Sequence, residues 1–190
     1  MVIKLVSAII LAAGKSVRMG SCKQLLEFRG RPIITHLIEN VSASKVNEII
    51  LVLGFQADKI KKKITGNNQI KTIINKDYEL GMSTSIKAGL KIIDKNADAA
   101  LVVLGDQPFL EPAVINKLID AYKRKKPLIV VPVYKMKRGN PVLIDRNLFT
   151  NIEKVSGDIG ARPLIQKYRA KVLEVNVNTQ NILTDIDTLS

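Results

Sequence analysis

Short apolar runs alternate with amphipathic segments along most of the chain, and this alternation limits the folds that it can adopt. Runs typical of buried strands cover residues 5–13, 48–53, 70–74, 99–104 and 128–132. Segments with helical periodicity cover residues 32–43, 57–64, 83–93 and 112–126. Strands that alternate with helices form parallel sheets, because each helix carries the chain back across the sheet. We therefore expect a mostly parallel, doubly wound sheet with helices on both faces.

After Pro132 the alternation becomes less regular. We expect a strand at residues 142–144, helices near residues 146–152 and 160–168, and a last strand at residues 172–175. No repeat, low-complexity segment or linker divides the chain. Its 190 residues, 46% of them hydrophobic, are enough for one core of ordinary size. The sequence thus predicts one domain that spans residues 1–190.

The composition limits the cellular compartment in which the protein is expected and the kinds of metal or disulfide site that it can form. No apolar run approaches the roughly 18 residues that a membrane-spanning helix needs, and Lys4 interrupts the N-terminus where a signal peptide would be apolar. Cys22 is the single cysteine, which excludes an internal disulfide and suits a reducing compartment. One histidine and one cysteine are too few for a Cys/His zinc site. We expect a cytoplasmic protein that does not bind membranes.

The net charge of +13 is large for this length, so nucleic acid has to be considered as a partner. Aromatic residues make up only 4% of the chain and tryptophan is absent, which leaves little for base stacking. Many lysines lie on predicted helices, as at residues 59–63 and 123–126. We interpret them mainly as solvated helix ends and do not expect nucleic-acid binding.

The segment after the first predicted strand combines glycine with cations. Gly14 ends the apolar run, and Lys15, Arg18 and Lys23 follow. Glycine lets a backbone approach a ligand closely, and backbone N–H groups bind anions. Because the cations can neutralise phosphates, this loop predicts a site for a nucleoside triphosphate.

A P-loop does not fit this segment. Gly14-Lys15-Ser16 matches the last three positions of G-x-x-x-x-G-K-[ST]. The first glycine of that pattern would fall at position 9, which is Ile9 within the strand. The loop therefore belongs to another class of nucleotide site.

Two further segments follow predicted strands, where open α/β sheets bind their ligands. Asp106 comes after the run 99–104, and a carboxylate at the end of a strand is a natural ligand for Mg²⁺, although it can also belong to a simple turn. Gly81 precedes a predicted helix that Ser83 or Thr84 can cap. The N–H groups of such a helix can bind an anion, although a plain cap without a ligand has the same pattern.

Polar residues also mark the C-terminal half. Gly139-Asn140-Pro141-Val142 forms a turn before a strand, and Arg162 suits bidentate recognition of a phosphate. From spacing alone, Asp158 is equally suited to cap a helix there. Cys22 lies next to Lys23, which can lower a thiol pKa, but we assign no role to this cysteine.

Near the end of the chain, Asp185 and Asp187 fall on the same side of an extended segment.

Together these segments resemble the MobA-like nucleotidyltransferases, and most of all their molybdenum cofactor cytidylyltransferase branch. The matching segments, in order, are residues 11–20 with Lys23, residues 81–85, 105–108, 139–142, 157–162 and 185–188. Asn140 stands where the family often has histidine. The resemblance implies the three-layer αβα, Rossmann-like nucleotidyltransferase fold. It also implies that CTP is used, because Ala13 replaces a glycine of the GTP-using branch.

The resemblance further implies roles for individual residues. Those expected to bind the nucleotide are Leu11, Ala12, Ala13, Gly14, Lys15, Ser16, Arg18, Lys23, Gly81, Ser83 and Asp106. Arg18, Lys23 and Asp106 are expected to be catalytic, and Asp106 with Asp187, preferred over Asp185, to hold Mg²⁺ or Mn²⁺. Those expected to contact the acceptor are Gln107, Asn140, Pro141 and Arg162.

The leading hypothesis is transfer of CMP from CTP, or of another NMP from its NTP, to the phosphate of a molybdopterin-type cofactor, with release of pyrophosphate. A sugar-phosphate or polyol-phosphate cytidylyltransferase is the first alternative. A carrier that delivers the cofactor to a molybdoenzyme partner is the second. Asp106 and Lys23 favour catalysis, because a carrier has no need of them.

Overall fold

A computed structural model describes residues 5–15, 22–64 and 70–185 of the chain. Within these residues a mixed sheet forms the middle layer, and its strand order is β10-β7-β9-β6-β1-β4-β5, with β8 paired to β7. The strands are β1 (Val6–Ala12), β4 (Glu48–Leu53), β5 (Ile70–Ile74), β6 (Ala99–Leu104), β7 (Ile129–Tyr134), β8 (Lys137–Arg138), β9 (Val142–Asp145) and β10 (Val172–Asn176). A separate small hairpin pairs β2 (Glu27–Phe28) with β3 (Arg31–Pro32).

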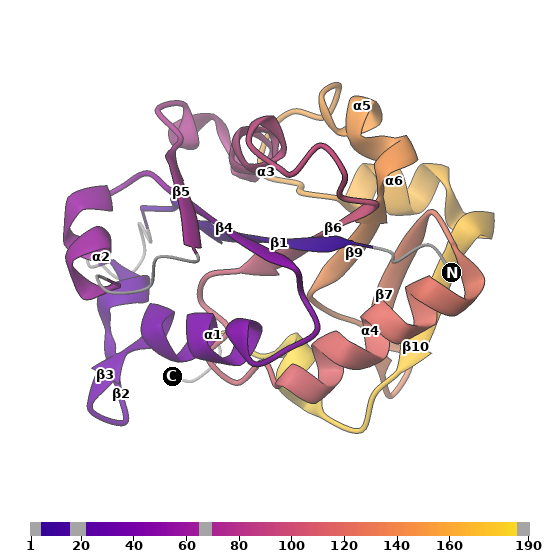
Figure 1. Cartoon of the computed structure of the whole chain (residues 1–190), viewed down its shortest axis with the longest axis horizontal. Coiled ribbons are helices and arrows are strands. Elements are labelled where there is room, and N and C mark those ends of the chain that lie inside the picture. The colour runs from indigo at the N-terminus through magenta and orange to yellow at the C-terminus, as the bar shows by residue number, and fades with distance from the viewer. Residues whose placement is uncertain (1–4, 16–21, 65–69, 186–190) are drawn as a thin grey trace.

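Helices cover both faces of this sheet (Figure 1). On one face lie α1 (Ile33–Ser42), α2 (Ala57–Lys63) and α4 (Pro112–Lys125), and on the other α3 (Met82–Lys91), α5 (Phe149–Ile152) and α6 (Arg162–Lys167). Short 3-10 turns are η2 (Lys23–Leu25), η3 (Tyr78–Leu80), η4 (Arg146–Leu148), η5 (Arg169–Lys171) and η6 (Gln180–Leu183). The expected three-layer αβα, Rossmann-like fold is confirmed.

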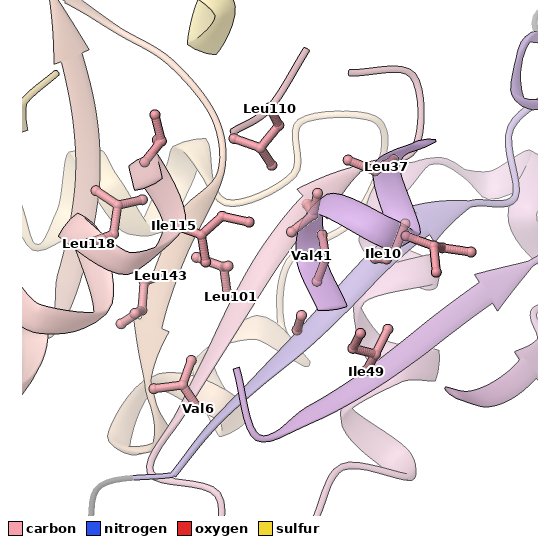
Figure 2. Close-up of a cluster of buried hydrophobic side chains, with 14 of the residues drawn as sticks. Val6, Ile10, Leu37, Val41, Ile49, Leu101, Leu110, Ile115, Leu118 and Leu143 are labelled. Carbon is pink, nitrogen blue, oxygen red and sulfur yellow. The ribbon is translucent and has the colours of Figure 1, made fainter. Parts of the chain in front are cut away.

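Two apolar clusters hold the layers together. Figure 2 shows the cluster under α1 and α4, where Leu37 and Val41 face Ile10 of the central strand, and Ile115 and Leu118 pack nearby. All five side chains are fully buried. The second cluster joins the opposite face of the sheet to α3, α5 and α6. Central strands that are buried on both faces read as unbroken apolar runs, which is why β1, β4 and β6 are recognisable in the sequence.

The sheet is parallel except at β9 and β8. Strand β1 pairs parallel with β4 and β6, whereas β9 lies antiparallel between β6 and β7, with Val102 opposite Val142. The carboxyl ends of β1, β4 and β6 therefore lie at one edge of the sheet, and the beginning of β9 lies at that same edge. This arrangement determines which loops can meet.

Candidate active site

A cavity of about 650 Å³ opens at this edge of the sheet. Segments far apart in the chain form its wall, and the lining residues are Leu11, Ala13, Gly14, Lys15, Lys23, Gln24, Tyr78, Glu79, Gly81, Met82, Ser85, Leu104, Gly105, Asp106 and Asp158. Six residues that we expect to bind the nucleotide, besides Leu11, are in this wall. Ala12 is instead fully buried in the core, and Ser16, Arg18 and Asp187 lie outside the described residues.

A buried lysine and an aspartate face each other in the cavity. The Nζ atom of Lys23 lies 4.0 Å from Oδ2 of Asp106. Lys23 is only 7% exposed and belongs to η2, whereas Asp106 follows β6. Removing a lysine from water is costly unless an opposite charge accompanies it. The pair therefore fixes a cation and a carboxylate at a defined place in the cavity wall.

The end of β1 contributes a tightly packed wall. A Cβ atom added to Gly54 would lie 2.8 Å from the Cβ of Ala13 and 2.8 Å from Cγ of Tyr78, so only glycine fits between them. The Ala13 carbonyl accepts a hydrogen bond from the Phe55 N–H at 3.0 Å. Gly14 is exposed, and an added Cβ would meet nothing within 4 Å. The Ala13 methyl group is thus held rigidly beside an open stretch of backbone.

Lys15 and Glu79 form an ion pair between two walls of the cavity. The Lys15 ammonium also lies 5.9 Å from the centre of the Tyr78 ring. The hydrogen bond and charge of Glu79 raise the pKa of Lys15, and Lys15 in turn lowers the pKa of Glu79. Both side chains are largely exposed, so a phosphate that enters can compete with Glu79 for the ammonium group.

The first N–H groups of α3 are not open to a ligand as we expected, because a distant loop accepts their hydrogen bonds. The helix begins at Met82, and its Met82 N–H donates to the Asp158 carboxylate at 3.1 Å. The Ser83 N–H donates to the Gly157 carbonyl at 3.2 Å. Gly81 has φ +105°, and an added Cβ would lie 2.4 Å from the Gly157 carbonyl carbon. The loop around Asp158 therefore occupies the donors that we expected to be open to an anion, and Asp158 caps α3 rather than the helix that follows it.

Hydrogen bonds from the Asn75 side chain hold the first turn of α3 in place. Its buried amide donates to the hydroxyls of Thr84 at 2.8 Å and Ser85 at 3.0 Å, and it accepts from the Asp77 N–H at 3.0 Å. Ser85 reaches the cavity wall, whereas Ser83 is 1% exposed and its hydroxyl has no hydrogen-bond partner among the described residues. Asn75 and Ser85 are not among the residues expected from the sequence, although Ser85 lies within the segment 81–85 and Asn75 follows the predicted strand 70–74.

The expected acceptor residues meet the C-terminal segment. Gln107 is 2% exposed, and its amide donates to the Thr184 carbonyl at 3.4 Å, which brings the half-buried Asp185 beside the Asp106–Gln107 turn. The Asn140 N–H donates to the Ile182 carbonyl at 2.9 Å, and the following peptide bond to Pro141 is cis.

Arg162 is the exposed first residue of α6 and does not line the cavity.

Carboxylate oxygens are the donors that Mg²⁺ and Mn²⁺ prefer, and Mg²⁺ sites at nucleotides use one or two of them with substrate phosphates. Asp106 lines the cavity, and Asp185 lies on the segment joined to it through Gln107. The described residues contain no group of three or more His, Cys, Asp or Glu side chains placed to hold a metal ion. The residues present fit a metal that shares its coordination with a bound nucleotide.

The single cysteine and the single histidine of the chain both have structural contacts. Cys22 is 4% exposed, and its thiol donates to Oε1 of Gln24 at 3.1 Å. Burial raises the pKa of this thiol, contrary to the effect that we considered for the neighbouring Lys23. His36 Nε2 lies 2.7 Å from the Phe28 carbonyl oxygen, which ties α1 to the β2–β3 hairpin.

In the described part of the chain, no helix has both the length and the apolar character to span a bilayer.

Known proteins share this architecture. The Escherichia coli (strain K12) molybdenum cofactor cytidylyltransferase is 26% identical over 188 residues, which cover 96% of this chain and 91% of that protein. The bifunctional protein GlmU of Staphylococcus epidermidis is 31% identical over 126 residues, but these cover 65% of this chain and only 27% of GlmU. The structure of Rv0371C from Mycobacterium tuberculosis H37Rv in complex with manganese superposes with a TM-score of 0.79 at 25% identity, covering 92% of this chain and 89% of that one.

The family model of the MobA-like NTP transferase domain matches residues 8–172, which include most of β1, Lys23 and Asp106 of the cavity, and the whole of α3. This chain therefore belongs to the MobA-like NTP transferase family and is a nucleotidyltransferase.

Proposed function

We propose that the protein transfers CMP from CTP to the phosphate of a molybdopterin-type cofactor and releases pyrophosphate. The observation that carries this proposal is the Lys23–Asp106 pair inside a cavity walled by Ala13 and Gly14. Similarity to the Escherichia coli molybdenum cofactor cytidylyltransferase extends over nearly the whole of both chains, and this supports the choice of acceptor.

In this reaction a phosphate oxygen of the acceptor attacks the α-phosphorus of CTP. A new P–O bond forms, the bond from the α-phosphorus to the bridging oxygen breaks, and the electron pair leaves with pyrophosphate. No covalent intermediate on the protein is required, so catalysis consists of positioning and charge stabilisation. Lys23 stabilises charge on the transferring group, and Arg18 is proposed to stabilise pyrophosphate.

Asp106 is the ligand that we propose for Mg²⁺ or Mn²⁺, together with Asp187 or, within the described residues, Asp185. A bound divalent ion neutralises phosphate charge and orients the triphosphate. The pairing of Asp106 with Lys23 keeps the carboxylate in the cavity before the nucleotide arrives. Gln107 contributes by holding the Thr184–Asp185 segment against the same turn.

We propose that Ala13 selects CTP. Its methyl group is fixed by Gly54 and by the hydrogen bond to Phe55, so it cannot move aside for a larger base. Gly14, which follows it, leaves the backbone open to the ribose and phosphates. Gln107, Asn140, Pro141 and Arg162 are proposed to contact the acceptor.

A sugar-phosphate or polyol-phosphate cytidylyltransferase remains the second candidate. It would use the same Lys23–Asp106 pair and differ from the first proposal only in the acceptor. A carrier without catalysis is disfavoured, because it would not need the buried Lys23 beside Asp106. We further propose that residues 1–190 form one domain that works in the cytoplasm, delivers its product to a molybdoenzyme and binds neither nucleic acid nor membranes.

The experiment that tests the proposal is a matrix of nucleotides and acceptors. CTP, GTP, ATP and UTP are each combined with molybdopterin cofactor, sugar phosphates and a polyol phosphate in the presence of Mg²⁺, and pyrophosphate release is measured. We expect release with CTP and the molybdopterin cofactor. Turnover confined to a sugar or polyol phosphate would instead establish the second candidate.

A further inference from the structure

A second groove lies at the opposite edge of the sheet. Strands β7 and β10 run parallel to each other, and β7 runs in the same direction as β6, because both are antiparallel to β9. The beginnings of β7 and β10 therefore face away from the cavity that contains Asp106. A groove of about 440 Å³ is found there between the end of α4, η5 and the beginning of β10. Residues of this groove cannot take part in nucleotidyl transfer.

The groove has an apolar floor. Pro127 and Leu128 contribute to it from the link after α4, and Val172 and Leu173 contribute from β10. All four are half-buried, so part of their apolar surface stays in contact with water. Covering such surface is favourable, roughly in proportion to the area removed from water. The floor offers a place for an apolar side chain.

Cations surround this floor. Lys125, Lys126 and Lys171 line the groove, and Arg124 and Arg169 belong to the same turns. All five are exposed, and within the described residues none of them forms an ion pair with a carboxylate.

The sequence around the groove explains why its charge is not neutralised. Residues 121–144 and 159–173 contain no Asp or Glu. The acids that border these stretches are engaged elsewhere, since Asp120 pairs with Lys45 at 2.7 Å and Glu174 pairs with Arg138 at 2.7 Å. The groove is therefore a concentrated positive surface. Its cations repel one another, and a bound anion would relieve this repulsion.

The dipole of α4 explains only some of the positive charges around the groove. Cations in the last turn of a helix interact favourably with its dipole, which explains Lys123, Arg124 and Lys125. It does not explain Lys171, which comes from η5. Lys126 has φ +49° at the C-cap, a left-handed conformation in which glycine would be more stable. Its charge is thus present at a conformational cost.

We propose that this groove is a docking site for an acidic segment of a partner protein, with Asp or Glu side chains on the lysines and an apolar side chain on the floor. Charge complementarity and the apolar floor together favour a peptide. A polyphosphate would leave the floor uncovered. A single-stranded nucleic acid would need aromatic stacking surfaces, and none of the residues lining the groove is aromatic.

The test uses the full chain and a fluorescein-labelled peptide of repeated Glu-Glu-Leu triplets, with binding followed by fluorescence anisotropy. The matched probes are a Glu-Glu-Ser peptide and a single-stranded oligonucleotide of equal charge. The groove variant carries Lys125→Glu and Lys171→Glu, and the control carries Lys59→Glu and Lys63→Glu on the exposed surface of α2, so that net charge changes equally.

We expect the groove variant to bind the Glu-Glu-Leu peptide at least about tenfold more weakly than the wild type, whereas the control loses less than about twofold. We also expect the Glu-Glu-Ser peptide to bind more weakly than the Glu-Glu-Leu peptide. Equal losses in the two variants would overturn the proposal in favour of net charge alone, and equal binding of the two peptides would overturn the role of the floor. Tighter binding of the oligonucleotide would make the groove a nucleic-acid surface instead.

Lys126→Gly separates folding from binding. This change relieves the left-handed lysine, so we expect a higher melting temperature together with weaker peptide binding. A variant that is stabilised and binds as tightly as the wild type would exclude Lys126 from the site. The rate of pyrophosphate release should be unchanged in the groove variant and in Lys126→Gly, because the groove lies at the other edge of the sheet.

Discussion

The Asp158 carboxylate accepts a hydrogen bond from the Met82 N–H at 3.1 Å, although the two residues come from different halves of the chain. This bond joins the segment that precedes α6 to the first turn of α3, and both residues line the cavity. Together with the hydrogen bond from the Ser83 N–H to the Gly157 carbonyl, it holds the Gly157–Asp158 loop against the start of α3.

We predict that Asp158→Ala lowers the free energy of unfolding by about 1 kcal/mol, the usual cost of losing a helix cap. Asp158→Asn keeps an oxygen that accepts from the Met82 N–H and should retain most of the stability. Denaturant unfolding of both variants measures the difference. An alanine variant as stable as the wild type would show that the bond contributes nothing.

Replacing Asp106 by Asn keeps its size and removes its charge. We expect transfer to fall by about 10²-fold or more, because the carboxylate is proposed to hold the metal at the phosphates. We also expect a lower melting temperature, because the buried Lys23 loses its opposite charge. The matched control is Asp120→Asn on α4, where the carboxylate pairs with Lys45 far from the cavity. Unchanged turnover of Asp106→Asn at saturating Mg²⁺ would refute its role.

Lys23→Met keeps the aliphatic length of this buried side chain and removes its positive charge. We expect a loss of about 10²-fold in kcat and a smaller effect on folding, because methionine fills the same space. Arg18→Ala should likewise reduce rate more than stability. Pyrophosphate release and thermal unfolding are compared with Lys59→Met as the control; a less stable Lys23→Met variant with full activity would make Lys23 structural.

Ala13→Gly is predicted to raise the use of GTP relative to CTP. The methyl group is proposed to exclude a purine by steric contact, and selection of this kind amounts to about 1–3 kcal/mol, or roughly tenfold to a few hundredfold in kcat/KM. Both nucleotides are measured for the wild type, Ala13→Gly and a control Ala113→Gly on the exposed side of α4. A wild-type preference for GTP, or a ratio unchanged by Ala13→Gly, would contradict the prediction.

Glu48 should make stability depend on pH in the acid range. Burial alone would raise its pKa, but hydrogen bonds from Lys71, Ser7 and the Asp94 N–H outweigh burial and lower the pKa below its ordinary value. A lowered pKa means that the stabilisation is present above the unfolded-state pKa, about 4.3, and is lost as the pH falls through the folded-state value.

Glu48→Gln should therefore destabilise the protein by about 1 kcal/mol at neutral pH and by less at acid pH. Unfolding by urea across this pH range measures the effect, and an equal loss at every pH would exclude it.

Local patterns predict much of this fold and part of its site. The buried strands β1, β4 and β6 can be recognised in the sequence as apolar runs. The segments at their carboxyl ends converge because parallel strands end at one edge of the sheet. The position of β9 between β6 and β7 depends on pairings between distant residues, which no local pattern contains. The capping of α3 by Asp158 is likewise a contact between distant segments, and so is the ion pair of Lys15 with Glu79.

The reversed direction of β9 has a consequence for how the surroundings of Asp106 can vary. Because Val142 lies opposite Val102, the chain first reaches the active-site edge at the end of β6, returns to it at the Asn140–Pro141 turn, and leaves it again along β9. The hairpin of β7 and β8 precedes that turn and ends on the surface. Residues in this hairpin can be lengthened or replaced without shifting β6, so this border of the site can diverge while the geometry around Asp106 stays the same.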